Sequence, residues 1–194
     1  MVVGLGNPGQ AYQKTRHNLG WMVLEHAAQR WGIRFTQQGQ ALQGLGTVRG
    51  SSVLLVLPLI WMNQTGEVIH ALLEDRNLTP SDLILVYDDL DLPLGAFKIK
   101  ARGGHGGHNG LRSFLDCLGT ENFSRLKVGI GRPPVHEDPA QYVLSPFAPD
   151  ECGQLEAVIP KAVDALECLM REGISVAMNR FHSPPPQPPN MEEG

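Results

Sequence analysis

The sequence is short of several features, and each absence narrows what the chain does. Only three of its 194 residues are cysteines, and none forms a C-x-x-C pair, so neither a disulfide framework nor a cysteine zinc site is expected. It has no run of about 18 apolar residues that would span a membrane. It begins Met-Val-Val-Gly without a basic and apolar leader, so we expect a cytoplasmic protein without membrane association.

The chain also lacks an excess of positive charge, because its net charge is −4. This excludes a protein that coats nucleic acid without specificity, which needs a broadly basic surface. The basic residues are nevertheless concentrated, since residues 98–132 hold seven lysines and arginines against two acidic residues, a local charge of +5. Such a segment indicates either a binding face for an anionic partner or a solvated surface, and the charge pattern leaves both open.

The remaining composition, 42% hydrophobic and 19% charged, is typical of one globular domain. Short apolar runs alternate with amphipathic stretches, which predicts an α/β fold with a mixed, mostly parallel sheet sandwiched between helices. We expect strands at residues 2–5, 53–57, 83–87, 96–100 and 126–130, and residues 43–49 could be one more, at an edge of the sheet. We expect helices at residues 19–31, 66–75, 110–118 and 149–171, and a last segment at 174–181.

Local signals refine the helix ends and the domain limits. Asn18 and Gly32 are suited to cap the first helix at its two ends, and Pro160 should bend or break the long helix at 149–171. The domain covers residues 1–182. The proline-rich segment 183–194 has no periodicity and is expected to be disordered.

Residues 4–9, Gly-Leu-Gly-Asn-Pro-Gly, match the G-x-G-x-x-G pattern of dinucleotide-binding turns. The context argues against that site, because Pro8 has no N–H for a phosphate and no apolar helical stripe follows. The turn instead predicts that Asn7 lies at the carboxyl edge of the sheet, where α/β proteins place their sites.

Two further polar segments should reach the same edge. His17 precedes the first helix, whose positive end favours a neutral ring that is able to act as a base. Asp88 follows the strand at 83–87, where a carboxylate can orient a histidine and stabilise its protonated form. The acidic run 88–91 would also suit Mg²⁺, or be only a solvated turn.

A glycine-rich loop at 103–110 lets backbone amides approach a polar or anionic ligand closely. His105 and His108 raise the question of zinc, but the loop offers no further nitrogen or sulfur donor, and we expect no metal. Asn63 and Asn109, like Asn7, stand beside strand ends or glycine turns. Their amides could read peptide groups, or could simply be turn and cap residues.

Six motifs, in this order, resemble those of the bacterial-type peptidyl-tRNA hydrolases over residues 2–181. They are G-L-G-N-P-G, Y-x-x-T-R-H-N-x-G, M-N-x-x-G, D-D-L-D-L-P-x-G, G-G-H-G-G-H-N-G-L-R and R-L-K-V-G-I-G-R-P. The resemblance implies an enzyme that hydrolyses the ester between a peptide and the 3′-terminal ribose of tRNA, without metal or other cofactor. The implied partner is peptidyl-tRNA, bound through its acceptor stem and 3′ CCA end. No protein partner is evident, and a monomer is expected.

By position, the resemblance assigns the catalytic base to His17, its supporting acid to Asp88, and recognition of the N-blocked peptide to Asn7. Positions that contact the peptide and the tRNA 3′ end match Tyr12, Trp61, Met62, Asn63 and Asn109. Positions that hold acceptor-stem phosphates match Lys98, Lys100, Arg125 and Lys127. Trp61 stands where a smaller aromatic is more common and Lys127 where an arginine can occur, so its phosphate contact would lack the guanidinium fork.

We expect neutral His17 to activate a water, and Asn63 or a backbone amide near the glycine loop to stabilise the oxyanion. Two rival hypotheses differ in class. One is a non-catalytic module that grips a tRNA 3′ end, and would bind tRNA without turnover. The other is a nucleotide-binding α/β protein that uses the two glycine loops, and would bind nucleotides without tRNA.

Overall fold

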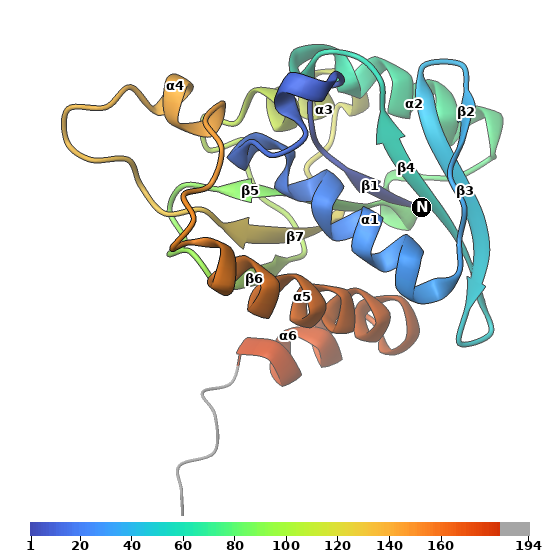
Figure 1. Cartoon of the computed structure of the whole chain (residues 1–194). Coiled ribbons are helices and arrows are strands. Elements are labelled where there is room, and N and C mark those ends of the chain that lie inside the picture. The colour runs from blue at the N-terminus through green and yellow to red at the C-terminus, as the bar shows by residue number, and fades with distance from the viewer. Residues whose placement is uncertain (183–194) are drawn as a thin grey trace, which may run out of the picture.

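The computed structural model describes residues 1–182, in which a seven-stranded sheet lies between two layers of helices (Figure 1). The strands are β1 (Val2–Gly4), β2 (Thr36–Gln38), β3 (Ala41–Val48), β4 (Ser51–Pro58), β5 (Ile84–Asp89), β6 (Phe97–Lys100) and β7 (Ser124–Gly129). Their order is β2-β3-β4-β1-β5-β7-β6, and β3 and β6 run opposite to the other five. The predicted mixed, mostly parallel α/β sheet is confirmed.

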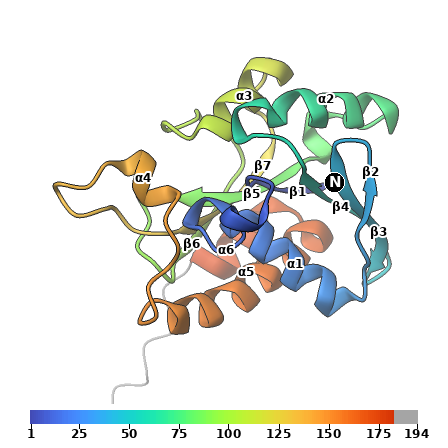
Figure 2. The same ribbon diagram turned by 45° about the horizontal axis from the view of Figure 1, so that its top comes forward.

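Helices cover both faces of this sheet, each over its own apolar core (Figure 2). One face carries α1 (Leu19–Trp31), α5 (Cys152–Glu172) and α6 (Ile174–His182), and the other carries α2 (Thr65–Asp75) and α3 (Asn109–Leu118). The short α4 (Pro139–Val143) projects from the sheet on a long excursion of the chain. Single turns of 3-10 helix are η1 (Gln10–Tyr12), η2 (Arg16–Asn18), η3 (Met62–Gln64) and η4 (Pro80–Asp82). Among residues 1–182, no helix combines the length and the hydrophobicity needed to cross a bilayer.

The start of α1 lies close to the sheet because two glycines leave out their side chains. A Cβ at Gly20 would lie 2.3 Å from the carbonyl oxygen of Val86, and one at Gly4 would lie 2.6 Å from the carbonyl oxygen of Gly20. The backbone of α1 therefore meets β1 and β5 directly. This approach brings η2, which carries His17, to the carboxyl end of β5, where Asp88 lies.

Several local expectations are wrong. Asn18 precedes α1 but does not cap it, because its side chain accepts a hydrogen bond from the N–H of Asn7 and donates one to the carbonyl of Asn7, both at 2.9 Å. Of the bend or break expected at Pro160, the break is absent, because α5 continues through the proline as one helix with buried side chains on both sides of it. Neither β2, which is polar and exposed, nor the five-residue α4 was predicted, since neither has an apolar periodicity. The strand expected at the edge, residues 43–49, is β3, and it lies inside the sheet because β2 pairs with it on the outer side. The expectation for residues 183–194 lies outside the described residues.

Candidate active site

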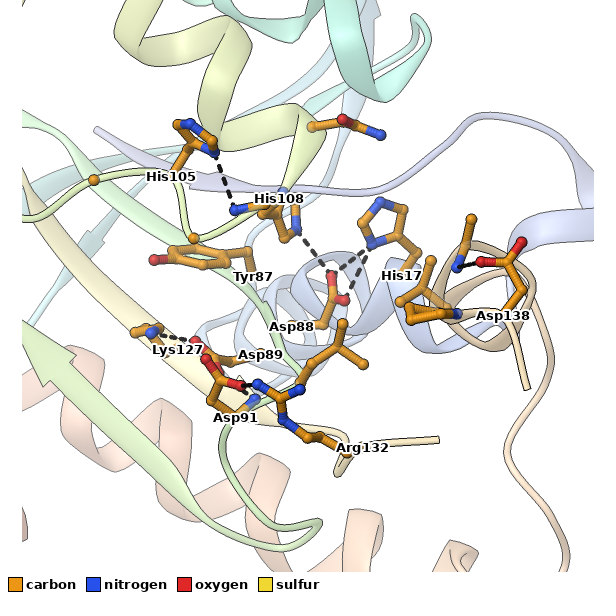
Figure 3. A pocket seen from close by; sticks show the side chains of 18 residues that line it. His17, Tyr87, Asp88, Asp89, Asp91, His105, His108, Lys127, Arg132 and Asp138 are labelled. Atoms are coloured by element: carbon orange, nitrogen blue, oxygen red, sulfur yellow. Dashed lines mark hydrogen bonds and ion pairs between the residues drawn. The ribbon is translucent and has the colours of Figure 1, made fainter. Parts of the chain in front are cut away.

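Three side chains from distant parts of the chain meet at the carboxyl end of β5 (Figure 3). His17 Nδ1 lies 2.9 Å from Asp88 Oδ1 and 3.1 Å from Oδ2, and His108 Nε2 lies 3.1 Å from the same Oδ1. The cluster is nearly removed from solvent, with the Asp88 side chain 2% exposed and each histidine side chain 9% exposed. The expected partnership of His17 and Asp88 is therefore present, and His108 joins it.

The hydrogen bonds fix where the protons are. An ionised carboxylate can only accept, so Nδ1 of His17 and Nε2 of His108 both carry the hydrogen that they donate to Asp88. On His108 the remaining Nδ1 accepts the N–H of Leu111 at 3.3 Å and caps α3. On His17 the remaining Nε2 points away from Asp88, as Figure 3 shows, and no hydrogen bond to it is found within residues 1–182. Only His17 is left with a basic nitrogen for a reaction.

The electrostatics separate the two histidines. Burial opposes protonation of His17, but the charge of Asp88 and its hydrogen bond outweigh it, so the pKa of His17 is raised above its ordinary value. For His108 burial prevails and the pKa is lowered, which keeps that ring neutral. Burial alone would raise the pKa of Asp88, yet the two histidines hold it well below its usual range. The positive end of α1 was expected to lower the pKa of His17, but the charge of Asp88 has the larger effect.

The cluster forms part of the wall of a cavity of about 480 Å³. The other walls come from Tyr87 and the acidic turn after β5, from the glycine loop, and from α4 with the residue before it. The lining residues outside the cluster include Tyr87, Asp89, Asp91, Asn109, Lys127, Arg132, Asp138, Pro139, Ala140 and Val143. Burial raises the pKa of Tyr87 to about 12, so its hydroxyl stays protonated. The cavity is thus large enough for a small organic group beside His17.

The other acidic side chains of this turn are already paired. Asp89 forms an ion pair with Lys127, and Asp91 forms one with Arg132. The ligand atoms of His17, Asp88 and His108 all lie within 4.8 Å of one another, which is the one cluster in residues 1–182 that could hold a metal ion. The two histidine nitrogens that face Asp88 carry the hydrogens that its carboxylate accepts, so they have no lone pair for a metal ion. The three side chains therefore fit a hydrogen-bonded triad better than a metal centre.

Asn7 and Met62 lie next to each other at the ends of β1 and β4. The side-chain Oδ1 of Asn7 accepts the N–H of Met62 at 3.0 Å, and because that N–H can only donate, the orientation of the amide is settled. No hydrogen bond from the Nδ2 end of Asn7 is found within residues 1–182. Met62 in turn packs on the start of α3, where a Cβ at Gly110 would lie 2.5 Å from its sulfur. The start of α3, which carries the predicted residue Asn109, thus packs against Met62 of the Asn7–Met62 pair.

The remaining predicted contact residues are accessible. Tyr12 and Trp61 meet edge to face with ring centroids 5.8 Å apart, and Trp61 is 53% exposed. Asn63 is exposed in η3, directly after Met62. Lys98 and Lys100 both face solvent on the edge strand β6, on either side of the fully buried Ile99.

The structure gives Arg125 a different role from the expected phosphate contact. The residue is 1% exposed, and its guanidinium donates to the carbonyl oxygen of Gly104 at 3.0 Å and lies 4.4 Å from the ring centre of Phe123. The side chain holds the glycine loop onto β7 and offers no free hydrogen-bonding edge at the surface. Lys127 is committed to Asp89 and faces the cavity.

Sequence reasoning missed the role of His108, which it weighed only as a zinc ligand. A signal was present, because a histidine between a glycine loop and Asn109 stands at a helix N-cap and so lies on the same sheet edge as Asp88. The wall formed by α4 was also missed. There the only signal was Asp138 followed by Pro139, a short helix start without an apolar stripe.

Comparisons with known proteins agree on one family. Residues 1–189 match the family model described as peptidyl-tRNA hydrolase. A peptidyl-tRNA hydrolase of Roseiflexus castenholzii is 46% identical over 190 residues, which are 97% of this chain and 89% of that protein. One of Nocardia farcinica is 44% identical over 184 residues, 94% of this chain and 95% of that protein. The crystal structure of peptidyl-tRNA hydrolase from Acinetobacter baumannii matches with a TM-score of 0.89 and 33% identity, covering 94% of this chain and 93% of that one.

Proposed function

The chain belongs to the peptidyl-tRNA hydrolase family, and from the geometry of its site we propose how it hydrolyses the ester bond of peptidyl-tRNA. The observation that carries the proposal is the 2.9 Å contact of His17 Nδ1 with the buried Asp88, which leaves Nε2 of His17 as a free base beside the cavity. His17 is the general base, Asp88 is its charge partner, and His108 holds the Asp88 carboxylate from the other side.

The reaction begins with a water molecule next to His17. Nε2 takes a proton from this water as its oxygen attacks the ester carbonyl carbon, and Asp88 stabilises the imidazolium that forms. The tetrahedral oxyanion collapses, the bond to the 3′ oxygen of the ribose breaks, and the imidazolium returns the proton to that oxygen. Asn63, exposed beside the Asn7–Met62 contact, is the proposed oxyanion donor.

The mechanism needs no metal, and one assay tests that. Purified protein in EDTA is incubated with N-acetylaminoacyl-tRNA, and the released N-acetyl amino acid is measured. We expect full turnover, with no gain on adding Mg²⁺ or Zn²⁺ beyond the effect of these ions on the tRNA itself. Loss of activity in EDTA that returns with one metal would contradict the general-base mechanism. Tight tRNA binding without any release would point to the non-catalytic module instead.

The acceptor stem and 3′ CCA end are the proposed docking elements of the tRNA. Lys98 and Lys100 support this, since both are exposed on β6 and carry no ion pair among those found in residues 1–182. Tyr12 and Trp61 present aromatic surface on which a terminal base can stack. All these groups come from one chain, so we propose that a monomer suffices. Three free thiols fit a reducing compartment, which supports the cytosol as its location.

Replacing Lys98 and Lys100 together by alanine should raise KM and flatten its dependence on salt. Removing one lysine–phosphate interaction should reduce the slope of log KM against log salt by about one unit. The measurement is KM for N-acetylaminoacyl-tRNA across a series of KCl concentrations. Lys161→Ala combined with Arg171→Ala, two exposed cations on α5, is the control with the same charge change. An equal slope in both double variants would mean that β6 does not bind phosphate.

Asn7→Asp should narrow the preference for blocked over free substrates. The enzyme must accept the amide nitrogen of a peptide and refuse the ammonium of aminoacyl-tRNA, whose burial beside a neutral amide is unfavourable. A carboxylate still accepts the N–H of Met62, removes the free Nδ2 donor, and partly compensates an ammonium. We expect a smaller ratio of kcat/KM for N-acetylaminoacyl-tRNA over aminoacyl-tRNA, chiefly because the blocked substrate suffers. An unchanged ratio would mean that Asn63 or Asn109, and not Asn7, recognises the N-blocked peptide.

A further inference from the structure

Arg16, the residue directly before the catalytic His17, is buried and bound to a single distant segment of the chain. Its backbone N–H donates to the carbonyl of Ser145 at 3.0 Å. Its guanidinium donates to Ser145 Oγ at 2.7 Å, to the carbonyl of Pro146, and to Glu151 Oε2 at 2.6 Å. The side chain is 8% exposed. We call residues 138–151, which include α4 and carry these partners, the α4 arm.

Aromatic rings of the same arm complete the enclosure. The guanidinium carbon lies 4.2 Å from the ring centre of Tyr142 and 5.1 Å from that of Phe147, so the cation is held against two π faces. The Tyr142 hydroxyl donates to the carbonyl of Ile130 at 2.7 Å, which ties the arm to the end of β7 as well. Glu151 Oε2 also accepts the N–H of Ala148 at 2.6 Å, so the acid that neutralises Arg16 closes a turn of the arm.

The arm is one wall of the cavity beside His17. Its residues Asp138, Pro139, Ala140 and Val143 line the cavity opposite the glycine loop. Figures 1 and 2 show α4 well away from the helical layers, although Tyr142 is buried in the core shared with α1 and α5, and Val143 and Phe147 pack against that core. The contacts of Arg16 add directed hydrogen bonds to this packing, and they come from the same 3-10 turn, η2, that carries His17.

We propose that the cavity wall formed by the α4 arm contacts the peptide, and that Arg16 is a positioning residue that fixes this wall at a set distance from the general base His17. A buried cation with an unpaired Nε is an expensive way to gain stability, since apolar packing would serve as well. A planar fork that bonds two carbonyl groups, a hydroxyl and a carboxylate at once is suited to fix one geometry. The proposal rests on the hydrolytic function and adds a determinant of peptide binding to it.

Loss of Arg16 should affect substrate binding and not the chemical step. Arg16 touches neither Asp88 nor the cluster's hydrogen bonds, so its loss should leave the pKa of His17 in place. A displaced wall should weaken contacts to the peptide beyond the first residue. The effect should therefore grow with peptide length and appear in KM more than in kcat.

The test uses Arg16→Lys, which keeps the charge and loses the fork, on two substrates with the same tRNA. One carries an N-acetylated amino acid and the other an N-acetylated tetrapeptide. We expect KM for the tetrapeptide substrate to rise about tenfold, equivalent to ~1.4 kcal/mol, with a smaller rise for the short one. The acid limb of the pH profile of kcat/KM should stay in place, and hydrogen exchange should quicken in residues 139–147 alone. Arg30→Lys, which alters an exposed ion pair between α1 and α5, is the matched control.

Glu151→Gln is the second variant, because it removes the charge but keeps an oxygen for the N–H of Ala148. Glu151→Gln should also raise KM for the tetrapeptide substrate, by a smaller factor than Arg16→Lys does. If Arg16→Lys does not fold, this second variant tests the proposal. An equal rise of KM on both substrates, or a shift of the acid limb of the pH profile, would overturn the proposal, since Arg16 would then act through His17. Failure of the general-base mechanism would instead show in the pH profile of the unmodified enzyme, so the two failures are distinguishable.

Discussion

His17→Ala should lower kcat for N-acetylaminoacyl-tRNA by at least about 10²-fold while tRNA affinity stays nearly unchanged. A positioned general base contributes about 10² to 10⁴ in rate, and it contributes to the transition state more than to the bound substrate. The other histidine of the cluster, His108, does not offer a substitute for this base. Nδ1 of His108 accepts the N–H of Leu111, its Nε2 donates to Asp88, and burial lowers its pKa. Single-turnover hydrolysis measures the rate, and binding of deacylated tRNA measures affinity.

His70→Ala is the control for this prediction. His70 lies half exposed on α2, where it pairs with Glu74, so its removal should change neither quantity. The affinity measurement guards against misfolding, because an unfolded variant would also lose tRNA. Turnover of His17→Ala within a few-fold of the unmodified enzyme would remove His17 from the chemistry and leave the cavity without an assigned base.

Asp88→Asn should lower kcat by a smaller factor than His17→Ala does, and should shift the pH profile. The imidazole remains but loses the charge that stabilises its protonated form. In the folded enzyme Asp88 raises the pKa of His17 against the effect of burial. Without that charge burial dominates, the pKa of His17 falls, and its basic form persists to lower pH. The acid limb of kcat/KM should therefore move to lower pH, measured from about pH 4.5 to 8.5.

Asp116→Asn is the matched control, because it makes the same chemical change at an exposed position on α3. It should leave both the rate and the acid limb unchanged. An acid limb that stays in place in Asp88→Asn would mean that another group limits the reaction at low pH. A shift to higher pH would contradict the electrostatic role that the 2.9 Å contact implies.

The sequence predicted most of the local structure because local structure depends on local signals. The helix at residues 19–31 was predicted with both bounds correct, and Gly32 ends it in a left-handed conformation with φ of 66°. The elements that were missed, β2 and α4, carry no apolar periodicity. The expected cap by Asn18 failed for another reason. A side chain that can bond its own helix can equally bond a neighbouring loop, and here Asn7 offers both an N–H and a carbonyl.

Arg125 shows the limit of reading function from residue type. In the sequence it belongs to a basic segment, and nothing separates it from Lys98 or Lys100. In the structure it sits opposite Lys100 in the β6–β7 register, yet it is buried beneath the glycine loop while Lys100 is exposed. Which cations reach solvent depends on what packs over each strand, and that is not written in the charge pattern.

The sequence by itself determined the polar groups that follow the strands or precede α1, including Asn7, His17 and Asp88, because apolar runs and glycine turns place strand ends and helix starts at one edge. Only the tertiary structure decided which of them touch. Asp88 meets His17 and His108 because the sheet order sets β5 beside β1, and because Gly20 lets α1 approach both strands. The α4 arm meets Arg16 across about 130 residues. Contacts at such separations follow from strand order and close packing, which no local signal in the chain encodes.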